Sequence, residues 1–246
     1  MAAGKFLASV NQSRGSSLNS QMIKAVIFDI DGTLVDSVDL HAKAWQEAFA
    51  HFGKQVSFDA VRSQIGKGGD QLLPVFLSRD EEKRFGEELE HFRSDLFKRK
   101  YLPQVKSFPR VRELMQRVKE DGLQIALASS AKGEEVDIYK RIAHIEDLVE
   151  EQTSADDAKR SKPHPDIFEA ALRRLREVDA QNAIAIGDSP YDAIAAGKLG
   201  ITSIGVLSGG FPETDLRAAG YSEIYKSCAD LLEHYDDSLL GRKRAA

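Results

Sequence analysis

Two carboxylates stand almost side by side near the amino end of the chain. In the stretch KAVIFDIDGTLVDS, residues 24–37, Asp29 and Asp31 are separated by one isoleucine and followed by Gly32. Either aspartate alone could be an ordinary turn residue before a glycine, but two carboxylates this close oppose each other's ionisation. A hard divalent cation such as Mg²⁺, which prefers oxygen ligands, would relieve the repulsion. The pair therefore predicts a metal site.

Further polar residues follow later apolar runs of the chain. Ser129 and Ser130 end one run, and Asp188 ends another, with Asp192 four residues on. Lys162 precedes a proline in the segment RSKPHPDIF. Ser129 could serve only as the N-cap of the next helix. However, ligands of α/β sheets bind beyond the carboxyl ends of the strands, so the pattern predicts carboxylates, a cation and hydroxyls gathered at one edge of a sheet.

Short, nearly continuous runs of Val, Ile, Leu and Ala are typical of parallel strands covered on both faces. Four such runs occur, at 24–30, 123–129, 182–188 and 201–207, and weaker strands are predicted near 147–150 and 223–225. Amphipathic helical patterns lie between them, at 111–122, 134–145 and 165–179. Strands that alternate with helices predict an α/β fold with a Rossmann-like, doubly wound parallel sheet.

This alternation is interrupted after the first strand. The segment HAKAWQEAFAHFG, residues 41–53, predicts a helix with one apolar stripe, formed by Leu40, Ala44, Trp45, Ala48, Phe49 and Phe52. No convincing strand pattern follows up to residue 103. We therefore predict an α-helical cap domain at 38–103, inserted into a core formed by 22–37 and 104–246. Residues 1–21, rich in Ser, Asn and Gly, are predicted to be a disordered extension, although they could also be a transit peptide.

Composition narrows the classes of function. The 246 residues include 34 Lys and Arg against 39 Asp and Glu, a net charge of −5, which argues against nucleic acid or an anionic membrane as the main partner. No apolar run approaches the ~20 residues that cross a bilayer. Cys228 is the only cysteine, which rules out an internal disulfide and is expected to be inert. A reducing, cytoplasmic location is expected.

Four motifs carry a resemblance to a known family. In the order and spacing found here, DIDGT, ALASS, SKPHPD and GDSPYD resemble the motifs of the haloacid dehalogenase (HAD) superfamily. The helical insert after the first strand resembles the C1 cap of its subfamily I, in the branch of β-phosphoglucomutase and phosphoglycolate phosphatase. The resemblance implies a Mg²⁺-dependent enzyme that acts on a small phosphorylated metabolite and is a monomer or weak homodimer.

The resemblance also implies a role for each residue of the first motif. Asp29 would be the nucleophile that forms an aspartyl-phosphate. Asp31 would protonate the leaving alcohol and later activate water, and its backbone carbonyl would reach the metal. Thr33 would help to orient the pair.

The other three motifs are implied to bind phosphate and metal. Ser129 and Ser130, with nearby backbone amides, would hold the phosphoryl oxygens, and Lys162 would balance their charge. Asp188 would bind Mg²⁺ directly, and Asp192 directly or through water.

Three functions stay open at this point. Asp31 argues against the dehalogenases, which usually lack the second aspartate. Mutases of this branch usually have Glu-Asp-Ser in the fourth motif, whereas Gly187 precedes Asp188 here, so a phosphatase is favoured over a sugar phosphomutase. A non-catalytic phospho-ligand binding protein is the third reading, and the intact aspartate pair argues against it.

The cap offers weaker candidates. The loop IGKGGD, residues 65–70, could face the active site, with Lys67 or Arg62 meeting an anionic part of the substrate, or it could be a surface turn. His41 is interpreted as a half-buried packing residue, with an active-site position as the alternative that the resemblance implies, and Trp45 as core.

Overall fold

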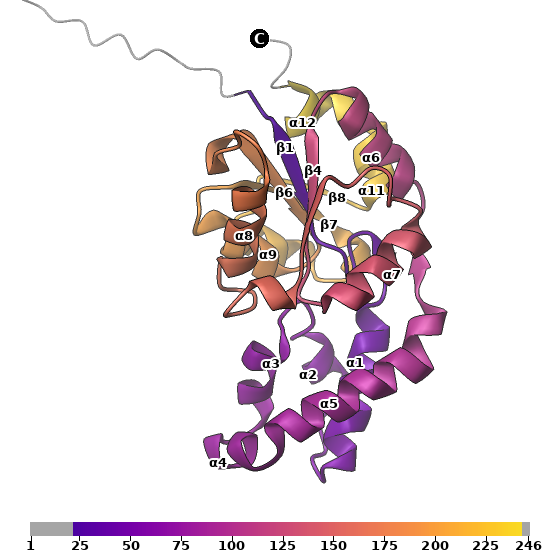
Figure 1. Cartoon of the computed structure of the whole chain (residues 1–246), viewed down its shortest axis with the longest axis vertical. Coiled ribbons are helices and arrows are strands. Elements are labelled where there is room, and N and C mark those ends of the chain that lie inside the picture. Colours follow the sequence, from indigo (N-terminus) through magenta and orange to yellow (C-terminus); the bar gives the residue numbers. More distant parts are fainter. Residues whose placement is uncertain (1–21, 243–246) are drawn as a thin grey trace, which may run out of the picture.

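A six-stranded parallel sheet forms the centre of the molecule. The structure, a computed structural model, describes residues 22–242 (Figure 1). The strands are β1 (Ala25–Phe28), β4 (Gln124–Ala128), β5 (Glu151–Thr153), β6 (Ala183–Gly187), β7 (Thr202–Val206) and β8 (Glu223–Tyr225). They pair in the order β5-β4-β1-β6-β7-β8, and every neighbouring pair is parallel. The order runs in opposite directions on the two sides of β1, as in a doubly wound Rossmann-like sheet, and confirms the predicted fold class.

Helices cover both faces of this sheet (Figure 1). They are α6 (Val111–Glu120), α7 (Gly133–Ala143), α8 (Asp166–Arg174), α9 (Pro190–Gly197), α10 (Glu213–Ala219), α11 (Cys228–Glu233) and α12 (Leu239–Arg242). Alternate side chains of a strand point to opposite faces. Val26 and Phe28 pack with α6, α7, α11 and α12, whereas Ala25 and Ile27 pack with α8 and α9. Because both faces are buried, the strands are nearly continuous apolar runs in the sequence.

One predicted strand is wrong in its position. The strand expected near 147–150 begins only at Glu151, as β5. The preceding residues form a turn, in which Asp147 is paired with Arg112 and Leu148 packs into the core. The apolar residues that suggested a strand are therefore buried by a turn.

The residues between β1 and α6 are mostly helical and lie at the other end of the molecule (Figure 1). Their helices are α1 (Val38–His51), α2 (Phe58–Arg62), α3 (Gly69–Phe76), α4 (Arg79–Glu81) and α5 (Glu87–Leu96), with π-helical turns at Glu82–Gly86 and Phe97–Tyr101 and a 3₁₀ turn at Leu102–Gln104. Trp45, Phe49 and Leu72 belong to a hydrophobic cluster separate from those of the sheet. We therefore propose residues 38–103 as a cap domain.

The apolar residues of α1 divide between two hydrophobic clusters, whereas a single apolar stripe was predicted. Trp45 and Phe49 pack inside the helical part, but Leu40 and Ala44 pack against the cluster on the sheet. Helix α1 therefore joins the two hydrophobic clusters.

A two-stranded ribbon that was not predicted joins the helical part to the sheet. β2 (Val35–Asp36) pairs antiparallel with β3 (Lys106–Ser107), so the two chain connections run side by side. Strands of two residues each are too short to leave a hydrophobic period in the sequence.

No helix between residues 22 and 242 is long and apolar enough to cross a membrane. The extension predicted at 1–21 lies outside the described residues.

Candidate active site

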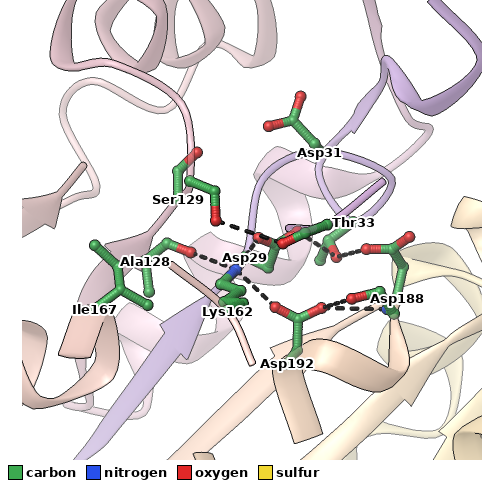
Figure 2. A network of polar contacts seen from close by, with 12 residues as sticks. Asp29, Asp31, Thr33, Ala128, Ser129, Lys162, Ile167, Asp188 and Asp192 are labelled. Atoms are coloured by element: carbon green, nitrogen blue, oxygen red, sulfur yellow. Dashed lines mark hydrogen bonds and ion pairs between the residues drawn. The ribbon is translucent and has the colours of Figure 1, made fainter. Parts of the chain in front are cut away.

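The central strands bring the predicted site residues to one edge of the sheet. Asp29 follows β1, Ser129 follows β4, which pairs with β1 on one side, and Asp188 follows β6, which pairs with it on the other. All three strands are parallel, so these side chains meet at their carboxyl ends, where the strand order reverses (Figure 2).

Lys162, from the loop before α8, lies at the centre of this group. Its Nζ lies 2.5 Å from Asp29 Oδ1 and 2.6 Å from Asp192 Oδ1, and it donates a hydrogen bond of 2.9 Å to the carbonyl of Ala128 (Figure 2). The lysine side chain is only 1% exposed. A buried ammonium of this kind is held by its partners, and it fixes two carboxylates at a set separation.

The fourth motif places its two aspartates by starting a helix. Ser189 is the N-cap of α9, Pro190 is the first helical residue, and Asp192 Oδ2 accepts hydrogen bonds from the Ser189 hydroxyl (2.6 Å) and amide (3.2 Å). This arrangement is a capping box. The side chain of Asp192 is therefore fixed between the helix end and Lys162.

The carboxylates exceed the available positive charge. Asp29, Asp188 and Asp192 are all buried and offer ligand atoms within 4.8 Å of one another. Three carboxylates and one lysine leave a charge of −2 when all are ionised. Burial, opposed by Lys162 and reinforced by Asp192, raises the pKa of Asp29 to about 7. Burial and then the charge of Asp29 also raise the pKa of Asp188 well above its ordinary value.

Lys162 shows the opposite balance. Burial acts to lower the pKa of this lysine, but the charges of Asp192 and Asp29 outweigh burial and raise it. Lys162 therefore stays positive.

This donor set fits a hard divalent cation. It consists only of carboxylate oxygens, which such cations prefer, and two positive charges would neutralise the remaining −2. Gly209 and Gly32 pack so closely on Asp188 Oδ2 that a methyl group at either position would overlap it, and Gly32 has a φ of +84°. Only glycine fits at these two positions beside the Asp188 carboxylate as it is placed here.

Asp31 is predicted as a metal residue, but its carboxylate lies outside the cluster. Its side chain points away from Asp188 and Asp192 (Figure 2), and it accepts hydrogen bonds from Ser37 Oγ (2.5 Å) and His41 Nε2 (2.9 Å). Burial acts to raise the pKa of Asp31, but electrostatic attraction to His41 and Arg93 and these hydrogen bonds hold it below its ordinary value. The contribution of its backbone carbonyl to a metal stays a prediction.

His41 packs as predicted, and it also takes the active-site position that was the alternative. It is 5% exposed, stacks on Phe97 at 3.9 Å between ring centroids, and contacts Asp31 and the Tyr139 hydroxyl (3.2 Å) through Nε2. Arg93 Nη2 lies 2.5 Å from Nδ1. An arginine can only donate, so Nδ1 accepts, and the proton of the neutral ring belongs on Nε2, facing Asp31. The packing histidine is in fact a polar link between the cap and Asp31.

The predicted phosphate-binding residues also lie in the site. Thr33 Oγ1 is 3.3 Å from both Asp29 Oδ2 and Asp188 Oδ1, so it can donate to either carboxylate. Ser129 is fully buried and accepts from the amide of Ala131 at 3.0 Å. The Ser130 hydroxyl donates to a cap carbonyl, that of Gly66, at 3.4 Å.

A cavity of about 280 Å³ lies between these residues and the helical part. Lys67 lines it, whereas Arg62 does not: Arg62 instead donates to Gly209 O (2.8 Å) and pairs with Asp39. Trp45 is core, as predicted, and also reaches the cavity wall.

Several lining residues are absent from the sequence-based prediction. They include Glu90, Arg93, Ser94, Lys132 and Glu135. Each lies in a charged helical stretch or beside a loop, where nothing in the sequence separates a solvent-facing residue from one that faces a cavity.

Comparison with known proteins identifies the family. A model of the haloacid dehalogenase-like hydrolase family matches residues 26–206. The chain therefore belongs to this family and is a hydrolase.

Two relatives are similar over most of their length. The "Phosphorylated carbohydrates phosphatase" of Thermotoga maritima is 30% identical over 185 residues, 74% of this chain and 84% of that protein. A "Phosphoglycolate phosphatase" of Rhodobacter capsulatus is 30% identical over 207 residues, 80% of this chain and 90% of that protein.

A solved hydrolase from Pseudomonas syringae has the same architecture. Its TM-score is 0.78 at 27% identity, covering 87% of this chain and 98% of the other.

Proposed function

We propose that this protein is a Mg²⁺-dependent phosphatase that hydrolyses a small phosphorylated metabolite, of the sugar phosphate or phosphoglycolate class, through an aspartyl-phosphate. The observation that carries the proposal is the placement of the two aspartates. Asp29 is buried against Lys162 and the metal-type cluster, while Asp31 is turned toward His41 at the cavity. One carboxylate is thus placed to attack phosphorus and the other to serve the leaving group.

The reaction has two balanced steps. In the first, a carboxylate oxygen of Asp29 bonds to phosphorus, the bond from phosphorus to the leaving oxygen breaks, and Asp31 gives that oxygen a proton. In the second, Asp31 takes a proton from water, whose oxygen bonds to phosphorus and releases phosphate and the Asp29 carboxylate. Lys162 and the Ser129 hydroxyl hold the phosphoryl oxygens in both steps.

The environment of Asp31 suits this exchange. Its lowered pKa keeps it ionised in the free enzyme, the form that accepts a proton. A phosphate dianion entering the cavity would oppose that charge and favour the protonated form needed in the first step. The Nε2 proton of His41 holds the carboxylate in position throughout.

Asp29, Asp188 and Asp192 would hold the Mg²⁺ ion. When bound, the ion supplies positive charge that offsets repulsion between the phosphate dianion and the carboxylate nucleophile.

The test is release of inorganic phosphate from a panel of sugar phosphates, polyol phosphates, phosphoglycolate and nucleoside monophosphates. We expect release that stops with EDTA, returns with excess Mg²⁺, and is lost in Asp29→Asn. Asp215→Asn is the matched control, because this aspartate is exposed on α10 and does not line the cavity. No release from any compound by a folded wild-type enzyme would reject the proposal.

A sugar phosphomutase is the alternative, and Gly187 bears on it. A side chain at this position would place its Cβ 2.6 Å from Asp192 Cβ, so the glutamate usual in mutases does not fit beside the observed Asp192. Conversion of a hexose 1-phosphate into its 6-phosphate, stimulated by a bisphosphate, would favour the mutase.

A further inference from the structure

Two charged side chains on the cavity wall have no contact with the substrate in the proposed reaction. Glu135 comes from the first turn of α7, and Arg93 comes from α5 of the cap. They approach the cavity from the core and from the cap respectively.

Glu135 is a buried carboxylate without a protein partner. It is 2% exposed, and no residue within 22–242 forms a hydrogen bond or ion pair with its carboxylate. It lies one turn before Tyr139 on the same side of α7, and the Tyr139 hydroxyl contacts His41. Glu135 therefore lies on the Asp31 side of the cavity, where the leaving group would be. Its oxygens are not among the fully enclosed side-chain atoms that lack a partner, so the carboxylate opens onto the cavity, where a donor on the ligand can reach it.

Arg93 supplies the complementary group. Its guanidinium lies 5.0 Å from the ring of Trp45 and 5.3 Å from that of Phe97, and its Nη2 is bonded to His41, so the side chain is fixed. Its Nε is buried and has no hydrogen-bond partner among the described residues. A rigid donor and a buried acceptor thus line the same cavity.

We infer that the leaving group carries several hydroxyls, so that the substrate is a sugar or polyol monophosphate, with Glu135 accepting a hydrogen bond from one hydroxyl. This inference rests on the proposed phosphatase function. A hydroxyl can donate to Glu135 and accept from an arginine, whereas the ionised carboxylate of a phosphoglycolate-like substrate can only accept and has no proton to donate to Glu135. Lys132 and Lys159 also line the cavity but are exposed, so they favour entry of any phosphate ester and do not discriminate.

The first experiment compares three phosphate esters with the wild-type enzyme: glucitol 6-phosphate, n-hexyl phosphate and phosphoglycolate. A site built to bond hydroxyls rejects an analogue that lacks them, by up to ~10⁴-fold. We expect kcat/KM for glucitol 6-phosphate to exceed both others by at least about a hundredfold. Equal or higher values for hexyl phosphate or phosphoglycolate would overturn the inference while leaving the phosphatase proposal intact.

Variants then test Glu135 itself. Glu135→Gln should lower kcat/KM for glucitol 6-phosphate roughly tenfold or more, the effect of losing a charged hydrogen bond, and leave that for hexyl phosphate unchanged. Glu134→Gln is the matched control, because the neighbouring Glu134 is exposed and pairs with Lys98, and it should change neither. An equal loss with both esters would mean a structural role for Glu135 and would reject the inference.

Binding to the inactive Asp29→Asn variant separates the two proposals. Glucitol 6-phosphate should bind this variant more tightly than hexyl phosphate does, measured by calorimetry, and adding Glu135→Gln should remove the difference. If the wild-type enzyme releases no phosphate yet this binding difference is present, the phosphatase proposal fails and the hydroxyl-binding role of Glu135 stands. If the two esters bind equally, the inference fails.

Discussion

At the scale of single residues, Asp29 is subject to two opposing requirements. It must be ionised to attack phosphorus, yet burial raises its pKa to about 7. A group whose folded-state pKa lies above its unfolded value destabilises the fold as pH rises between the two values, because the unfolded chain loses the proton first. The window here runs from about 4 to about 7.

The raised pKa of Asp29 predicts that the stability difference between wild type and Asp29→Asn depends on pH. In EDTA at pH 8, Asp29→Asn should have a free energy of unfolding higher than that of wild type by on the order of 1–4 kcal/mol, and so unfold at a higher temperature. It should show no such gain at pH 4. Excess Mg²⁺ should remove the gain at pH 8. Thermal unfolding followed by circular dichroism measures it, and an asparagine variant less stable than wild type at pH 8 in EDTA would contradict the explanation.

Gly209 gives a second residue-scale prediction. Because a methyl group there would overlap Asp188 Oδ2, Gly209→Ala should displace this carboxylate and weaken Mg²⁺ activation by at least about tenfold, with a comparable loss of kcat/KM. Gly197→Ala is the control, because a methyl group at that position in α9 would meet nothing within 4 Å. Metal titrations of activity compare the two, and equal Mg²⁺ requirements would show that the space beside Asp188 is not needed.

At the scale of elements, the sequence predicts strand ends better than helix faces. Asp29, Ser129 and Asp188 can be assigned to one site because each ends an apolar run, and parallel strands share one carboxyl edge. His41 and Arg93 cannot, because they lie in amphipathic helices where a polar residue is expected on the solvent side. Which polar residues face a cavity depends on how the cap meets the core, and no period in the sequence records that contact.

Residues 62–70 of the cap, called the cap loop below, are joined to the core by several hydrogen bonds. Arg62 Nη2 donates to Gly209 O at 2.8 Å, and the Tyr191 hydroxyl donates to Ser63 O at 2.6 Å. The Ser161 hydroxyl donates to Asp70 Oδ1 at 2.5 Å. These bonds hold the loop over the site, and Arg62 bonds directly to the glycine that packs on Asp188.

Loss of the Arg62 contact should therefore affect catalysis more than folding. Arg62→Gln is expected to raise KM by about three- to tenfold, the equivalent of one net hydrogen bond, and to change unfolding stability by less than about 1 kcal/mol. Arg79→Gln, an exposed arginine at the start of α4, serves as the control. A large loss of stability with unchanged KM would assign Arg62 to the fold and not to closure of the loop.

At the scale of the whole molecule, the loop that follows β1 is anchored to the far side of the core. Cys228 at the start of α11 is fully buried in the largest hydrophobic cluster, and its Sγ donates to the carbonyl of Thr33 at 3.3 Å. Thr33 is the residue that bridges Asp29 and Asp188. The only thiol of the chain therefore sits directly behind the active site.

This position makes Cys228 a reporter of opening of the whole core. Burial raises the pKa of its thiol to about 12, so at pH 8 only about one molecule in ten thousand carries the reactive thiolate. We expect no reaction with a thiol reagent in the native protein over hours, and one equivalent at once in concentrated guanidinium chloride.

The slow labelling rate of the native protein should follow the population of opened molecules. Mg²⁺ should therefore lower this rate and EDTA should raise it, because the metal binds only the folded cluster. Cys228→Ala controls for reaction elsewhere. Rapid labelling of the native protein, or a labelling rate that does not change with Mg²⁺, would mean that α11 opens independently of the metal site.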